Sequence, residues 1–157
     1  MKIGLGYDIH RLVDDRKMFL GGIEIPYIKG FLGHSDGDVL LHAITDALLG
    51  AAGLGDIGEH FPDTDFKYSG MDSKILLKQV VDLVNKNFNI SNIDSVIIAQ
   101  EPALAPFKKA IQSSVASILG LDVESVGIKA KTNECLGEIG RKEAIAVYAV
   151  ALLSRKG

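Results

Sequence analysis

The stretch EAIAVYAVALL, residues 143–153, decides the fold class, because it is apolar on both sides of the strand that it predicts. Alternate residues of a strand point to the same face. One face would carry Ala144, Ala146, Tyr148 and Val150, and the other would carry Ile145, Val147, Ala149 and Ala151. A strand has this pattern when both of its faces are covered. We therefore predict a sheet that is buried on both sides.

Strands and helices alternate along the rest of the chain. Residues 2–10 alternate between apolar side chains and polar residues or glycines, which predicts a half-buried strand. The segments on either side of Gly21-Gly22 predict a short hairpin. Further strands are predicted at residues 93–100 and 126–132, and helices within residues 34–55, 71–88 and 106–120.

Each predicted helix carries recognisable sequence signals. Ser35 or Asp36 suits the cap of the first helix, and Asp72 or Ser73 suits the cap of the second. In the third helix, Pro106 suits the first turn and Gly120 the end. The first helix also has an apolar stripe, formed by Leu40, Leu41, Ile44, Ala47 and Leu48.

This order of elements predicts an α+β fold, an α/β sandwich with a mixed sheet and helices on one of its faces. Three amphipathic helices suffice for one face of a four- or five-stranded sheet but not for two. The other face would be an apolar patch that a monomer rarely exposes. We expect a cyclic assembly, with the sheets facing its axis, to cover it. We also expect one domain over residues 1–157.

Composition excludes several classes of function. The formal net charge is −3, and the chain has no run rich in Lys and Arg, which argues against general nucleic-acid binding. The single cysteine, Cys135, excludes an internal disulfide and suits a reducing compartment. No signal peptide is recognisable, and no apolar run approaches the roughly 18 residues of a membrane helix. We expect a cytoplasmic protein with no membrane partner.

Three residues are candidates for a metal site. Asp8 and His10 lie two apart on the first predicted strand, so they share a face. His42 is the best third ligand, with Asp38 and Asp46 four residues to either side, where they could orient its ring. One carboxylate and two imidazoles leave a position open, as in catalytic zinc sites. The alternative is a surface acid, a surface histidine and an unrelated core histidine.

Three further stretches carry polar signals with an ordinary alternative for each. His34, beside a helix start, suits an anionic ligand, although residues 35–38 could be only a capping turn. Residues 55–65 are an acidic loop, either functional or a solvated connection. Residues 131–141 offer Lys, Thr, Glu and Arg side chains for phosphate and a hard cation, or form a polar hairpin tip. Together these stretches describe a diphosphate site that needs two cations.

Four motifs strongly resemble the family of 2-C-methyl-D-erythritol 2,4-cyclodiphosphate synthases of the non-mevalonate isoprenoid pathway. They are GYDIHRL at 6–12, GHSDGDVLLHAITDALLGAAGLGDIGEHFPDTD at 33–65, IIAQEP at 97–102 and KTNECLGEIGR at 131–141. The resemblance covers nearly the whole chain. It implies conversion of 4-diphosphocytidyl-2-C-methyl-D-erythritol 2-phosphate to the cyclic diphosphate with release of CMP. It also implies a homotrimer with active sites between neighbouring subunits.

The resemblance assigns roles residue by residue. Asp8, His10 and His42 match zinc ligands, and Glu134 matches the acid that holds a second ion, magnesium or manganese. His34 and Thr132 match residues that stabilise the transition state. Substrate-binding positions are Asp8, Ile9, His10, His34, Ser35, Asp56, Ile57, Gly58, Phe61, Pro62, Asp63, Thr64, Asp65, Ala99, Gln100, Glu101, Pro102, Ala103, Leu104, Ala105, Lys131, Thr132, Asn133, Glu134 and Arg141.

Two positions depart from the family pattern. Many relatives have Thr in place of Lys131 and a large apolar residue in place of Glu138, whereas Arg141 is retained. Ligand contacts at position 138 are therefore not carried over, nor is binding of isoprenoid diphosphates at the trimer axis. Two rival functions remain: a non-haem iron oxygenase, which also uses two histidines and a carboxylate, and a module that binds diphosphates without turnover.

Overall fold

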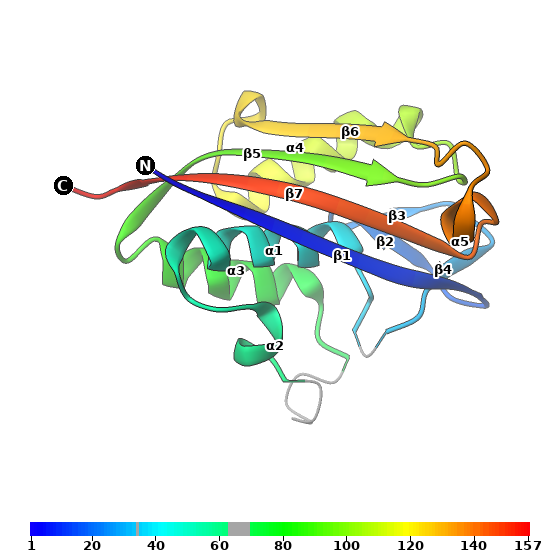
Figure 1. The fold of residues 1–157 in the computed structure, drawn as a ribbon, viewed down its shortest axis with the longest axis horizontal. Helices are drawn as coiled ribbons and strands as arrows, with labels where there is room; N and C mark the ends of the chain where they lie inside the picture. The colour runs from blue at the N-terminus through cyan, green and yellow to red at the C-terminus, as the bar shows by residue number, and fades with distance from the viewer. Residues whose placement is uncertain (34, 63–69) are drawn as a thin grey trace.

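The computed structural model describes residues 1–33, 35–62 and 70–157, which form a mixed sheet with helices packed along it (Figure 1). The sheet has five strands in the order β4-β1-β7-β5-β6. Their bounds are β1 (Lys2–Asp14), β4 (Lys29–Phe31), β5 (Phe88–Ile98), β6 (Val126–Lys131) and β7 (Ala144–Arg155). The hairpin predicted around Gly21-Gly22 is a separate two-stranded sheet, β2 (Met18–Leu20) and β3 (Ile23–Ile25).

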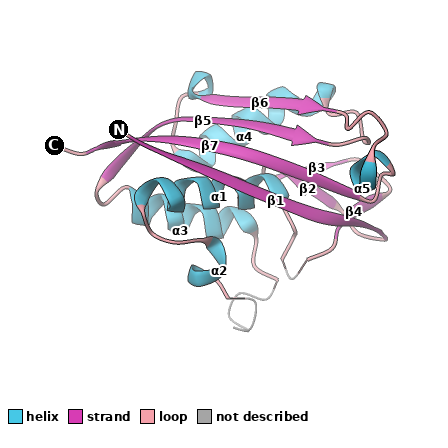
Figure 2. Cartoon of the chain, in the orientation of Figure 1, coloured by secondary structure: helices cyan, strands magenta, loops and turns pink. Residues whose placement is uncertain are grey.

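Three long helices and several short ones connect the strands (Figure 2). The long helices are α1 (Val39–Ala52), α3 (Ser73–Val84) and α4 (Lys108–Leu119). The short elements are α2 (Ile57–His60), α5 (Gly137–Gly140) and the 3₁₀ turns η2 (Ala105–Phe107) and η3 (Val123–Ser125). No helix in the described part of the chain is both long and apolar enough to span a bilayer.

The central strand of the sheet is β7, the strand with two apolar faces. It pairs antiparallel with β1 on one side and with β5 on the other, whereas β5 and β6 are parallel, so the predicted mixed sheet is confirmed. One face of β7 lies against the helices, and its residues Ile145, Val147, Ala149 and Ala151 are fully buried. The helical layer therefore covers only one face of the sheet.

Strand β1 lies on helix α1 without side chains between the two backbones. A Cβ atom added to Gly4 would lie 2.0 Å from the Ala47 carbonyl oxygen, and one added to Gly6 would lie 1.9 Å from that of Ala43. Only glycine permits this approach. The buried side of this half-buried strand is thus its glycine and polar side, which also carries Asp8 and His10.

The opposite face of the sheet is apolar and uncovered in the chain by itself. Ile3 is 73% exposed and Leu5 is 65% exposed, and Tyr7, Ile9, Tyr148 and Val150 are also exposed. The rings of Tyr7 and Tyr148, on paired strands, have centroids 4.7 Å apart. We call these six residues the open face. Its presence agrees with the prediction that the helices cannot cover both sides.

One of the two predicted N-caps is confirmed and the other is wrong. Asp72 caps α3 by accepting a hydrogen bond from the Lys74 N–H, as predicted. The prediction for α1 was wrong, because its cap is Asp38 rather than Ser35 or Asp36. Ser35 and Asp36 instead accept hydrogen bonds from N–H groups two residues on, within the preceding turn.

The other helix and strand ends differ by a few residues. Helix α4 ends at Leu119, with Gly120 (φ 68°) as its C-cap, as predicted, and Pro106 lies in the 3₁₀ turn that precedes the helix. Helix α3 ends at Val84, and β5 begins at Phe88, five residues before the predicted strand. The register of β5 against β7 shifts between Ile90 and Asn92, which interrupts the alternation from which that start was predicted.

Candidate active site

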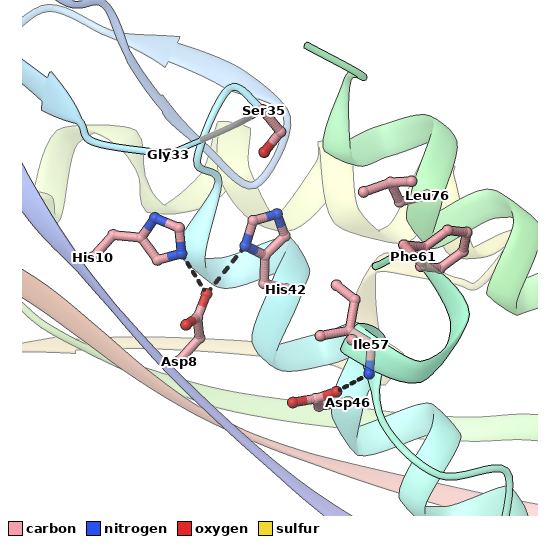
Figure 3. Close-up of a pocket in the computed structure, with 10 residues that line it drawn as sticks. Asp8, His10, Gly33, Ser35, His42, Asp46, Ile57, Phe61 and Leu76 are labelled. Atoms are coloured by element: carbon pink, nitrogen blue, oxygen red, sulfur yellow. Dashed lines mark hydrogen bonds and ion pairs between the residues drawn. The ribbon is translucent and has the colours of Figure 1, made fainter. Parts of the chain in front are cut away.

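The three predicted metal ligands lie together where β1 crosses α1 (Figure 3). The Asp8 Oδ2 atom lies 2.9 Å from His10 Nε2 and 3.1 Å from His42 Nδ1. One ligand atom from each residue lies within 4.8 Å of the other two. We call these residues the metal-site cluster, because one carboxylate and two imidazoles at this spacing can hold a divalent cation.

The ring of His10 is fixed by a backbone carbonyl on the side away from Asp8. Its Nδ1 atom lies 3.1 Å from the carbonyl oxygen of Leu32. A carbonyl only accepts hydrogen bonds, so Nδ1 carries the hydrogen and the lone pair of the neutral ring is on Nε2. That lone pair faces Asp8 Oδ2, and either a proton or a metal ion between the two atoms would satisfy both acceptors. This is the arrangement expected of a metal ligand and its supporting carbonyl.

The electrostatics of the cluster also favour positive charge. Burial alone would raise the pKa of Asp8, but hydrogen bonds and charge from His10 and His42 hold it below its usual range. Burial alone would lower the pKa of His10, but its hydrogen bond to Asp8 and the charge of that carboxylate raise it. The carboxylate is therefore ionised at neutral pH, and a proton or a metal ion is favoured beside it.

Asp38 and Asp46 do not orient His42, so that prediction was wrong. Asp38 is fully buried and accepts hydrogen bonds from the N–H groups of Gly21, Gly22 and Leu41, at 2.7–3.1 Å. Burial raises its pKa to about 6, although these three bonds oppose the shift. Asp46 accepts from the Ile57 N–H at 2.8 Å. The hydrogen-bond partners of the His42 ring are Asp8 and Ser73.

A cavity of about 250 Å³ opens beside the metal-site cluster (Figure 3). It is lined by Asp8, His10, Gly33, Ser35, His42, Asp46, Ile57, Gly58, Phe61 and Leu76. Six of the predicted substrate-binding residues are therefore in this wall: Asp8, His10, Ser35, Ile57, Gly58 and Phe61. Its mix of apolar side chains and a few converging polar groups is typical of small-molecule sites.

Other residues predicted for this region lie outside the wall or outside the described chain. Asp56 caps α2 by accepting from the Glu59 N–H. The Ile9 side chain belongs to the open face, and its N–H donates to Asp8 Oδ1 at 2.9 Å. Pro62 ends the described segment that contains α2. The predicted residues His34, Asp63, Thr64 and Asp65 lie outside the described residues.

The remaining predicted residues gather at the ends of β5 and β6. A second cavity, of about 310 Å³, is lined by Ala99, Gln100, Pro102, Ala103, Leu104, Ala105, Lys108, Ala130, Lys131 and Thr132. The Thr132 hydroxyl donates to Glu134 Oε1 at 2.7 Å, and Gln100 Oε1 accepts from the Cys135 N–H at 3.0 Å. We call residues 99–105 and 131–134 the loop cluster.

Ion pairs hold Glu101, a member of the loop cluster, and Arg141, which follows it in the chain. Glu101 accepts from Lys142 Nζ at 2.6 Å and from the Tyr27 hydroxyl at 3.2 Å. Asn133 donates to the Leu136 carbonyl. Arg141, predicted as a phosphate clamp, places Nε 2.9 Å from Glu143 Oε1. Its guanidinium charge is thus matched by an acid of its own loop.

The metal-site cluster lies on β1 and α1, whereas residues 131–134 of the loop cluster lie at the end of β6. Strand β1 and strand β6 are separated in the sheet by β7 and β5. Three spacings of about 4.8 Å make roughly 14 Å between the two strands. A diphosphate that touches both clusters of one chain would have to bridge that distance.

Two polar residues at the metal site were not predicted as site residues. Ser73 Oγ lies 2.9 Å from His42 Nε2, and the Asp36 carboxylate accepts from that same hydroxyl. Ser73 was considered only as a helix cap. It lies 31 residues from His42, so no strand or helix period connects the two. The sequence shows only a serine next to a predicted cap, which gives no sign of a contact with His42.

Comparison with known proteins gives one consistent result. The family model described as the YgbB family matches residues 1–154. A 2-C-methyl-D-erythritol 2,4-cyclodiphosphate synthase from Dechloromonas aromatica is 56% identical over 157 residues, covering 99% of this chain and 98% of the relative. One from Clostridioides difficile is 53% identical, covering 98% and 96%. A solved CDP complex of IspF from Plasmodium falciparum aligns with a TM-score of 0.87 at 38% identity, covering 99% and 97%.

Proposed function

Because the chain belongs to the YgbB family, we propose that it is a 2-C-methyl-D-erythritol 2,4-cyclodiphosphate synthase. It would convert 4-diphosphocytidyl-2-C-methyl-D-erythritol 2-phosphate to the 2,4-cyclodiphosphate. An oxygen of the 2-phosphate attacks the β-phosphorus, the bond from that phosphorus to the bridging oxygen breaks, and CMP leaves with that oxygen. This makes the enzyme a cyclising phosphorus–oxygen lyase. The observation that carries the proposal is the metal-site cluster beside its cavity.

The reaction brings two anions together, which explains the need for cations. Two unit charges about 4 Å apart repel by about 1 kcal/mol in water and about 4 kcal/mol at an effective dielectric of 20. A divalent ion, which we propose to be one Zn²⁺ per subunit, would supply Lewis acidity that polarises the β-phosphate. Asp8, His10 and His42 would hold it. Their donor atoms fit, because the His10 lone pair already faces the Asp8 carboxylate.

The loop cluster would act on the other end of the diphosphate. Glu134 would hold a second ion, Mg²⁺ or Mn²⁺, against the phosphates, and Thr132 beside it would stabilise the transition state together with His34. The hydrogen bond from Thr132 to Glu134 supports a joint role. Residues 99–105 would form the cytidine side. A relative from Plasmodium falciparum has been solved as a CDP complex, which supports a cytidine nucleotide as the ligand. No protein nucleophile is needed, and Cys135 has no role in the step.

A homotrimer would bring the two clusters together. The open face needs a cover, and a second and third copy of the chain around an axis would bury it. The roughly 14 Å between β1 and β6 supports a site in which the metal-site cluster of one subunit faces the loop cluster of the next. The net charge of −3 and the lone cysteine suit a cytoplasmic enzyme that binds no nucleic acid.

Release of CMP from the diphosphocytidyl substrate tests the proposal directly. The purified protein with Zn²⁺ and Mg²⁺ should yield CMP and the cyclic diphosphate in equal amounts. Binding of the substrate without CMP release would instead indicate a sensing module. Oxygen consumption with bound iron, and no CMP, would indicate an oxygenase that uses the same three ligands.

A further inference from the structure

A chain of hydrogen bonds leaves the metal-site cluster on the side away from Asp8. It runs from His42 on α1 to Ser73, the first residue of α3, and on to Asp36 in the turn before α1. Ser73 is 1% exposed, so water does not compete for its hydroxyl. Three separate segments of the chain therefore meet at one buried oxygen atom.

The direction of these bonds follows from the chemistry of the groups. An ionised carboxylate only accepts hydrogen bonds, so the single hydroxyl hydrogen of Ser73 goes to Asp36. The Ser73 oxygen is then an acceptor toward His42, and Nε2 of that ring carries the hydrogen. The lone pair of the neutral ring is left on Nδ1, which faces Asp8 Oδ2 at 3.1 Å.

Asp36 is itself fixed by backbone groups. Its Oδ2 atom accepts from the Ser73 N–H at 3.2 Å, and its Oδ1 atom accepts from the Asp38 N–H at the same distance. The carboxylate thus ties the turn before α1 to the start of α3. It holds Ser73 in place from two sides and leaves the hydroxyl one orientation.

We infer that Ser73, held by Asp36, is a positioning residue that sets the Nε2–H tautomer of His42 and thereby raises the affinity of the site for its metal. The Leu32 carbonyl fixes the tautomer of His10 in the same way. The lone pairs of both neutral rings are therefore directed at Asp8 Oδ2. The inference rests on the proposed metal site. Loss of such a supporting group typically lowers metal affinity 10–100-fold.

Chelator competition with Zn²⁺ alone, on the whole protein without substrate, measures this effect. Ser73→Ala should weaken zinc binding about 10–100-fold, and Ser73→Thr, which keeps a hydroxyl, should restore most of the affinity. Thr45→Val is the matched control. This substitution also removes a buried hydroxyl, that of Thr45 on α1. The Thr45 hydroxyl donates to the Leu41 carbonyl and not to His42, so zinc affinity should be unchanged.

The tautomer itself can be read from the ring ¹⁵N chemical shifts of the metal-free wild-type protein, with His42 identified by its absence in His42→Ala. Nε2 should carry a hydrogen, as its bond to the Ser73 oxygen requires. A dominant Nδ1–H form would overturn the inference, as would unchanged zinc affinity in Ser73→Ala or an equal loss in Thr45→Val. If the wild-type protein bound no zinc, the proposed function would fail, and the tautomer would still decide this inference. The tautomer reading needs no folded Ser73 variant.

Discussion

The metal-site cluster and the loop cluster differ in how they are held. The side chains of Asp8, His10 and His42 are only 14–26% exposed, and each has hydrogen-bond partners on another element of the fold. In the loop cluster, Thr132, Asn133 and Glu134 are bonded within their own loop or to its next residues. Glu134 has φ 49°, a backbone conformation that costs energy for a residue with a Cβ.

This difference suggests that the side chains of the two clusters are positioned in different ways. The metal-site cluster is organised by the fold of a single chain, before any ligand is present. In the loop cluster, the side chains of Thr132, Asn133 and Glu134 bond, within the described part of the chain, only to residues of the same loop, so we expect a neighbouring subunit or the substrate to complete that part. The two halves should therefore respond differently to substitution, which five experiments can measure.

His42→Ala should have the largest effect. The variant loses one of three ligands, so bound zinc should fall from one per chain to near none. Turnover should fall by at least about 10³-fold, because Lewis-acid stabilisation is worth several kcal/mol. Elemental analysis and circular dichroism measure the metal and the fold. Full zinc occupancy in this variant would refute the assignment.

Leu5→Asp should separate the subunits while leaving the metal-site cluster intact. A charge on the open face opposes its burial, so light scattering should show a mass near 16.8 kDa in place of three times that value. Turnover should fall by more than about 10²-fold because the two clusters no longer face each other, yet zinc should stay bound. Val123→Asp alters an exposed apolar residue on η3 and should remain trimeric. An active monomer would disprove both the trimer and the shared site.

Glu134→Gln should affect only the loop cluster. The variant keeps the shape of the side chain but loses the charge that would hold Mg²⁺ or Mn²⁺. We expect unchanged zinc content and a loss of turnover of about 10²-fold, most evident when the second ion is limiting. Glu138→Gln, in the same loop, should retain normal turnover. A Glu134→Gln variant as active as wild type at limiting Mg²⁺ would exclude this role.

Asp38→Ala should destabilise the protein more than Asp72→Ala, although both residues cap helices. Asp38 is buried with three N–H donors, so its loss should cost about 3 kcal/mol or more. Asp72 is a partly exposed cap, whose loss should cost about 1 kcal/mol. Urea denaturation measures both. Equal losses would mean that the three bonds to Asp38 carry little net stabilisation.

The pH dependence of the metal-free protein should give the smallest effect. The folded-state pKa of His10 is raised, so the stability that its proton provides is present below the unfolded pKa of about 6.5 and is lost as pH rises through the folded value. The raised pKa of Asp38 lowers the stability of the folded protein as pH rises from about 4 to about 6, which is below the range in which His10 acts. Above pH about 6.5, the melting temperature without metal should therefore fall by a few degrees. Zinc should reverse the fall, and a curve unaffected by zinc would contradict this account.

The sequence predicts those parts of the molecule that depend on local periodicity. The two faces of β7 and the shared face of Asp8 and His10 follow from a period of two. The buried side of β1 could not be predicted, because Gly4 and Gly6 have no side chains to indicate a packed face. The cap of α1 was predicted at Ser35 or Asp36 and lies at Asp38, because no local pattern distinguishes a polar residue of the preceding turn from the cap itself. Contacts such as Ser73 to His42 depend on how helices are placed in space, which no local pattern encodes.

The backbone contact between β1 and α1 determines how the metal site tolerates change elsewhere. Asp8 and His10 follow Gly4 and Gly6 on one strand, and His42 adjoins Ala43 on the helix that those glycines touch. The spacing of the ligands is thus set by two main chains in direct contact, with no side chains between them. Repacking of core side chains would leave that spacing intact. A single methyl group at Gly6 would clash with the Ala43 carbonyl oxygen and push α1 away from β1. The distance from His42 to Asp8 and His10 would then increase.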